Sequence, residues 1–121
     1  MSVTSTHRMP PWAGDGGSLQ ALAEELCRRG WGARVVRRSV VGDLDVRLRV
    51  TGAGTPAAEL LDTWGSTPCG DHWQAVLIEP HRRVVWCGPA RPCPMAELTA
   101  FVEDLLRLDR TELSEHYTAL G

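Results

Sequence analysis

One stretch in the middle of the chain alternates strictly between apolar and charged residues. In "LDVRLRV", residues 44–50, every second side chain is apolar, and Asp45, Arg47 and Arg49 fill the positions between them. Because successive side chains of a β-strand point to opposite faces, this pattern predicts a strand with one buried and one wet face. The buried face needs a covering layer, so the pattern predicts a two-layer fold.

Two hairpins follow from the neighbouring segments. Residues 33–41, "ARVVRRSVV", resemble a strand but break the alternation, so we allow a bulge there, and Gly42-Asp43 is the turn to the alternating strand. Further on, "WQAVLIE" and "RVVWC" flank a turn with Pro80 at its corner. Both of these strands are apolar on both faces, which is typical of central strands.

The first helix is predicted within "SLQALAEELCRRGWG", residues 18–32, with Ser18 as its cap and Gly30 as its left-handed stop. Its apolar stripe is made of Leu19, Leu22, Ala23, Leu26 and Cys27. The spacing of these residues is that of one helix face, so we expect Cys27 to be a small buried hydrophobe.

Three more helices are predicted. In "TPAAELLDTWG", Thr55 is the expected cap, Pro56 the first helical residue and Gly65 the stop, with Ala57, Leu60, Leu61 and Trp64 on one face. The longest helix begins at Pro94, and its core face is Met95, Leu98, Phe101, Val102, Leu105 and Leu106. A last short helix, capped by Thr111, carries Leu113, Tyr117 and Leu120.

The predicted order is α-β-β-α-β-β-α-α, in an α+β, two-layer domain. Its antiparallel four-stranded sheet, built from two hairpins, has helices on one face. Residues 1–17 are expected to be a flexible N-terminal arm, and residues 18–121 a single domain. This order is similar to that of secretion-chaperone-like and roadblock-like domains, although no motif of either family matches.

The composition of the chain and its first residues indicate where the protein is located rather than which reaction it performs. The chain has thirteen arginines and no lysine or asparagine, which indicates a GC-rich, actinobacterial-type genome and weakens any functional argument from the use of arginine in place of lysine. The first seventeen residues lack the apolar core of a secretory signal, and no apolar run is long enough to span a membrane. We therefore expect a cytoplasmic protein whose cysteines are mostly thiols or metal ligands.

The stretch "WCGPARPCP", residues 86–94, is similar over four residues to the thioredoxin active-site motif. Trp86, Cys87, Gly88 and Pro89 match, but Ala90 stands where the resolving cysteine belongs. The sequence that follows is only helical, whereas the thioredoxin fold continues with a strand pair. We therefore expect no thioredoxin-like chemistry.

A zinc site is an alternative for the cysteines. The second hairpin brings Cys69 and His72 beside Cys87 and Cys93, because antiparallel strands place the start of one next to the end of the other. Three thiolates and an imidazole form a tetrahedral zinc set, although the spacing of Cys87 and Cys93 is not that of a standard knuckle. No other cofactor is expected, and simple burial of each thiol is the plainer interpretation.

Cys93 is also the candidate for a reactive thiol, because the predicted start of the long helix and Arg91 both favour a thiolate. His72 is its candidate catalytic partner. The chain has no serine nucleophile elbow and no phosphate-binding loop, so an enzyme is the less expected function.

The arginines point instead to a protein partner. Residues 28–49 hold seven arginines against two aspartates, and the candidate partner-binding residues are Arg34, Arg37, Arg38, Arg47, Arg49, Trp31 and Trp73. No aromatic residues alternate with these arginines, so nucleic acid is not an expected partner. Residues 97–115 are acidic, so the arginines can also meet a second copy, while a solvated charged face is the plain alternative.

The sequence therefore predicts a small non-enzymatic adaptor, regulator or chaperone-like protein-binding domain that binds a protein partner or itself. A small zinc-binding protein with a Cys3His site and a thiol-dependent enzyme or redox protein using Cys93 stay as alternatives.

Overall fold

The computed structural model describes residues 17–40, 43–52, 54, 56–61, 69–91 and 93–120. The elements are α1 (Gly17–Arg28), β1 (Gly32–Val40), β2 (Asp43–Thr51), β3 (Ala57–Leu61), β4 (His72–Glu79), β5 (Arg82–Ala90), α2 (Met95–Arg107), α3 (Arg110–His116) and β6 (Thr118–Leu120). The predicted arm over residues 1–17 lies almost wholly outside the described residues. Among these elements, no helix has the length and apolar character needed to cross a membrane.

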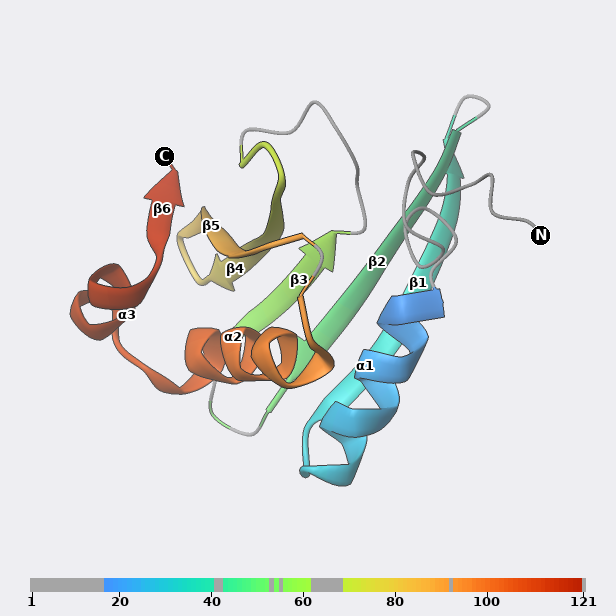
Figure 1. Ribbon diagram of the computed structural model, residues 1–121, viewed down its shortest axis with the longest axis horizontal. Coiled ribbons are helices and arrows are strands. Elements are labelled where there is room, and N and C mark those ends of the chain that lie inside the picture. Colours follow the sequence, from blue (N-terminus) through green and yellow to red (C-terminus); the bar gives the residue numbers. More distant parts are fainter. Residues whose placement is uncertain are drawn as a thin grey trace.

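The sheet has six antiparallel strands rather than the four predicted, and their spatial order is β1-β2-β3-β4-β5-β6. Each strand therefore pairs with its neighbours along the chain, and the sheet is a continuous meander (Figure 1). The two predicted hairpins, β1–β2 and β4–β5, are confirmed. The additional strands are β3, which joins the hairpins, and β6, which pairs with β5 at the edge.

Helices α1 and α2 lie side by side on one face of the sheet, as the two-layer prediction requires (Figure 1). Helix α1 packs on β1 and β2, and α2 packs on β3 and β5. The core between the layers includes Leu22, Leu48, Trp86 and Phe101, each at most 1% exposed. Gly30 has a φ of 96°, so it ends the first helix in the left-handed conformation, as predicted.

Residues 57–61 form strand β3, so the prediction of a helix over 55–65 is wrong. Ala58 and Leu60 are buried and the residues between them are partly exposed, which is the period of two of a strand. Strands β2 and β4 both need a partner, and β3 pairs with each of them. That pairing outweighs the local helix signal of the Thr55-Pro56 dipeptide. Trp64 and Gly65 lie outside the described residues.

Two smaller expectations also need correction. Strand β1 pairs with β2 in continuous register and has no bulge, and the irregularity lies instead in β4, between His72 and Gln74. Helix α3 is capped by Asp109 rather than Thr111: the Asp109 carboxylate accepts from the Glu112 amide, and the Glu112 carboxylate accepts from the Asp109 amide. Leu120, expected in this helix, belongs to β6.

Candidate functional site

The sheet has a second face, opposite α1 and α2, which we call the outer face. Leu48 and Leu60 are buried beneath the helices, so the residues next to them in each strand point the other way. One row of paired residues crosses this face over all six strands. The row is Arg34, Arg49, Glu59, Val76, Val85 and Leu120.

The outer face is apolar at its β4–β6 end. The register and the partial exposure of these side chains define an apolar strip. It consists of Leu61, Val76, Ile78, Val85 and Leu120, all of which are partly exposed. The strip crosses four neighbouring strands, and no described helix packs on this side of the sheet.

The β1–β2 end of the outer face is basic. Glu59 accepts from Arg47 at 3.1 Å and from Arg49 at 2.8 Å, so one carboxylate serves two guanidinium groups. Arg34 lies opposite Arg49 in the register and is exposed, and it forms no ion pair with any described residue. The face therefore carries excess positive charge beside an apolar strip.

The structure divides the predicted partner-binding residues. Arg47 and Arg49 lie together on the outer face, as the alternation predicted, and of the arginines expected beside them Arg34 lies there, opposite Arg49. Arg37 pairs with Val46, so it lies on the helix-bearing side, where it is exposed. The side chain of Arg38 lies outside the described residues.

Neither candidate tryptophan is an exposed anchor. Trp73 is 1% exposed, and the Arg91 guanidinium stacks 3.9 Å from its ring centroid. Trp31 is partly buried, and its indole N–H donates to the Glu103 carboxylate at 2.9 Å. Both side chains therefore hold the domain together.

The sequence indicates Arg91 only as a positive charge near Cys93. Besides stacking on Trp73, its guanidinium donates to the Leu61 carbonyl at 3.3 Å, and its amide donates to the Asp71 carbonyl at 2.8 Å. Arg91 thus ties the end of β3 to the segments around β4 and β5. An aromatic residue paired with an arginine distant in sequence gives no local signal.

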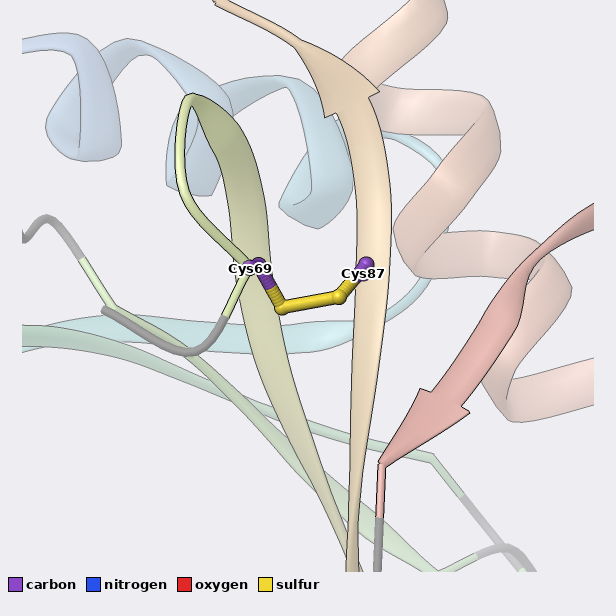
Figure 2. The surroundings of a disulfide bond; sticks show 2 residues. All are labelled: Cys69 and Cys87. Atoms are coloured by element: carbon purple, nitrogen blue, oxygen red, sulfur yellow. A yellow bond between two sulfur atoms is a disulfide. The ribbon is translucent and has the colours of Figure 1, made fainter. Parts of the chain in front are cut away.

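Cys69 and Cys87 form a disulfide between the segment before β4 and the middle of β5 (Figure 2). Their Cα atoms are 5.5 Å apart, and His72 pairs with Ala90 nearby. The predicted closeness of Cys69 and His72 to Cys87 is therefore confirmed, whereas Cys93 does not line the cavity that contains His72. The expectation that the cysteines are mostly thiols is wrong for this pair.

The four predicted zinc ligands do not come together as a set. Cys69 and Cys87 are bonded to each other, and Cys93 packs against the core beside Trp73. In the part of the chain that the structure describes, no group of three or more His, Cys, Asp or Glu residues is arranged to hold a metal ion. His72 instead lines a cavity of about 590 Å³ together with the disulfide, Glu97 and His116.

Cys93 has the opposite electrostatics to those predicted. Burial raises the pKa of its thiol, and the Glu97 carboxylate raises it further, whereas a hydrogen bond with Trp73 and the charge of Arg91 act in the other direction. At neutral pH this thiol is therefore protonated, which does not favour a nucleophile. Cys93 also does not line the cavity that contains His72.

Cys27 is exposed, so the prediction of a buried side chain at this position is wrong. It lies at the end of the apolar stripe, one residue beyond the buried Leu26. Its thiol donates to the Ala33 carbonyl of β1 at 3.4 Å. The thiol therefore contacts the backbone of β1 instead of the core.

No protein-family model matches the chain, and no curated protein or solved structure matches it significantly.

Proposed function

We propose that this protein is a non-enzymatic adaptor or chaperone-like module that binds a partner protein through the outer face of its sheet. The observation that supports the proposal most is the one-sided covering of the sheet. Strands β4 and β5 carry apolar side chains on both faces, a pattern of strands covered on both sides. The described helices that pack on these strands cover only one of those faces.

An apolar surface of this kind favours a protein partner. Apolar side chains that form one continuous patch, bordered by charge, are typical of interaction sites. The patch here is the apolar strip, and its border is the arginine end of the outer face. The excess positive charge there favours a partner with acidic residues, since complementary charge speeds and orients association.

The two alternative functions gain no comparable support. Cys69 and Cys87 are bonded to each other, which leaves the predicted zinc set without two of its thiolates. Burial raises the pKa of Cys93, which opposes a role as a nucleophile.

A single substitution at the centre of the apolar strip tests the proposal. We expect Val85→Glu to place a charge between Val76 and Leu120 on the outer face and to abolish complex formation. The tagged protein is purified from its natural source, together with any partner that stays bound to it. Sedimentation velocity then measures the size of this complex, and of mixtures of the same partner with the wild type or with each variant. The expected wild-type result is a dimer or a stable complex.

The matched control is Ala96→Glu, which adds the same charge at an exposed position of α2, and circular dichroism confirms that both variants are folded. A wild-type protein that is strictly monomeric and has no interactor contradicts the proposal. A complex that survives Val85→Glu but not Ala96→Glu places the interface elsewhere and also contradicts it.

A further inference from the structure

Strand β1 is an edge of the sheet. It spans nine residues, Gly32–Val40, and pairs with β2 along its whole length on one side. No described strand pairs with its other side. An edge strand offers a row of backbone N–H and C=O groups to which another extended segment can add.

One of these backbone groups has an unusual partner. The Ala33 carbonyl accepts a hydrogen bond from the Cys27 thiol, which is a weak donor. Cys27 itself is exposed. A stronger amide donor can replace the thiol at little cost. Because Cys27 is an exposed thiol close to β1, a bulky group can be attached to it to block this edge.

Two exposed arginines on β1 define what kind of segment fits. Neither Arg34 nor Arg37 forms an ion pair with a described residue, whereas Arg47 and Arg49 on the neighbouring strand share Glu59. Arg34 and Arg37 are three residues apart, so they lie on opposite faces of the sheet. An added strand therefore meets one guanidinium group on each of its faces.

We propose that β1 pairs with an extended segment of a partner protein that carries two acidic side chains three residues apart. Each acidic side chain then lies beside one of the two arginines, and opposite charges on adjacent strands stabilise their pairing. The inference rests on the proposed protein-binding function and names the chemistry of the partner.

The same arginines exclude two other occupants. A second copy that paired through its own β1 gathers the arginines of both copies at one edge, and like charges on adjacent strands are destabilising. Residues 1–16 of this chain contain one acidic residue, Asp15, so they lack the pair of carboxylates.

The test uses a fluorescent nine-residue peptide of threonine and valine with two glutamates three positions apart, which matches the length of β1. Fluorescence anisotropy measures its binding to the full-length protein. We expect binding that weakens when NaCl is raised from about 50 mM to about 500 mM, because ion pairs at the surface are screened. A peptide with lysines in place of the glutamates does not bind.

The spacing is tested by a peptide with the glutamates four positions apart, on a single face of the strand. Only one arginine is then satisfied, so the affinity falls. The double variant Arg34→Gln/Arg37→Gln weakens binding of the first peptide by about three- to tenfold, the effect of two exposed ion pairs. Arg110→Gln, which removes an exposed arginine on α3, leaves the affinity unchanged.

Strand addition is separated from simple charge attraction by hydrogen exchange. The bound peptide slows exchange of amides within residues 33–37, and attaching a bulky maleimide to Cys27 in a Cys93→Ser background prevents binding. Absence of binding, equal binding to both spacings, or unchanged amide exchange overturns the proposal. We expect Val85→Glu to leave peptide binding intact. Loss of partner binding in Val85→Glu and failure of the peptide to bind β1 are therefore separate results, and either one can occur without the other.

Discussion

Gly88 lies where β5 passes beneath α2, and the close approach of these two elements requires a glycine. A Cβ atom built at this position lies 2.6 Å from the Cε2 atom of Phe101, well inside van der Waals contact. The neighbouring atoms belong to a ring that is 0% exposed, so it has no room to move aside.

We expect Gly88→Ala to lower the free energy of unfolding by about 1–3 kcal/mol, the usual cost of overpacking a core. The measurement is urea denaturation followed by tryptophan fluorescence. In a Phe101→Leu background the same substitution costs less, because the colliding ring is gone. Equal costs in the two backgrounds would show that the Phe101 ring is not the obstacle.

Tyr117 is the single tyrosine of the chain, so its ionisation can be followed directly. Its hydroxyl donates to the Asp104 carboxylate at 2.8 Å, and its ring contacts Phe101 edge-on with centroids 4.9 Å apart. Burial, and next the hydrogen bond to Asp104, raise the pKa of Tyr117 above its ordinary value. The folded protein thus favours the neutral phenol.

This raised pKa predicts a loss of stability in alkali. Below the unfolded pKa of about 10 the contribution of Tyr117 is complete, and it is lost as the pH rises from there toward the folded pKa. We expect the free energy of unfolding to fall more steeply above about pH 10 in the wild type than in Tyr117→Phe. Both proteins carry Cys27→Ser and Cys93→Ser, so that thiols do not contribute, and parallel curves refute the prediction.

At the scale of elements, the disulfide joins the segment before β4 to β5. It closes a loop with a sequence separation of 18 residues, which contains all of β4 and the turn after it. A crosslink of this span restricts the unfolded chain, so it stabilises the folded one.

Reduction, or the double variant Cys69→Ala/Cys87→Ala, is expected to lower the free energy of unfolding by about 2–4 kcal/mol. Urea denaturation with and without a thiol reductant measures the effect. The reductant should leave the double variant unchanged. A wild-type protein that is equally stable in both conditions shows that the bridge contributes nothing.

The elements that the sequence predicts correctly are those specified locally. The alternation around Leu48 and the turn at Pro80 each lie within one hairpin, and both hairpins are present. The missed strands depend on distant partners: β6 pairs residue 120 with residue 85. In β3, Ala57, Leu60 and Leu61 have the spacing of one helix face, whereas Ala58 and Leu60 have the spacing of one strand face, and only the pairing with β2 and β4 decides between the two.

The candidate site follows the same division. The shared face of Arg47 and Arg49 could be predicted from period-two alternation, whereas the position of Arg34 beside them depends on the register of β1 with β2. The outer side of β4 and β5, on which no described helix packs, could not be predicted. Apolar residues on both faces of a strand predict burial on both, and which face the helices leave uncovered is a property of the whole fold.

At the scale of the whole molecule, Glu103 connects α2 to the segment between α1 and β1, about seventy residues earlier in the sequence. This carboxylate on α2 is 6% exposed and accepts hydrogen bonds from Arg29, just after α1, and from Trp31, just before β1. The Arg107 guanidinium, on the next turn of α2, lies 3.5 Å from the Glu103 carboxylate oxygen. The buried charge is therefore compensated by two guanidinium groups and an indole N–H.

We expect Glu103→Ala to lower the free energy of unfolding by about 1–3 kcal/mol, because it leaves the Trp31 N–H without its acceptor. Thermal unfolding followed by circular dichroism measures the change. Glu115→Ala on the exposed side of α3 is the matched control, with an expected effect within about 0.5 kcal/mol. Similar losses in the two variants would argue against a special role for the buried carboxylate.

The spatial order of the strands equals their order in the sequence from β1 to β6. During synthesis on the ribosome, each new strand from β2 to β5 finds its pairing partner already present in the segment made just before it. The sheet can thus grow by one strand at a time, before α2 is available to cover β3 and β5. We therefore expect the part of the sheet beneath α2 to stay exposed to water until residues 95–107 have left the exit tunnel and can pack on it.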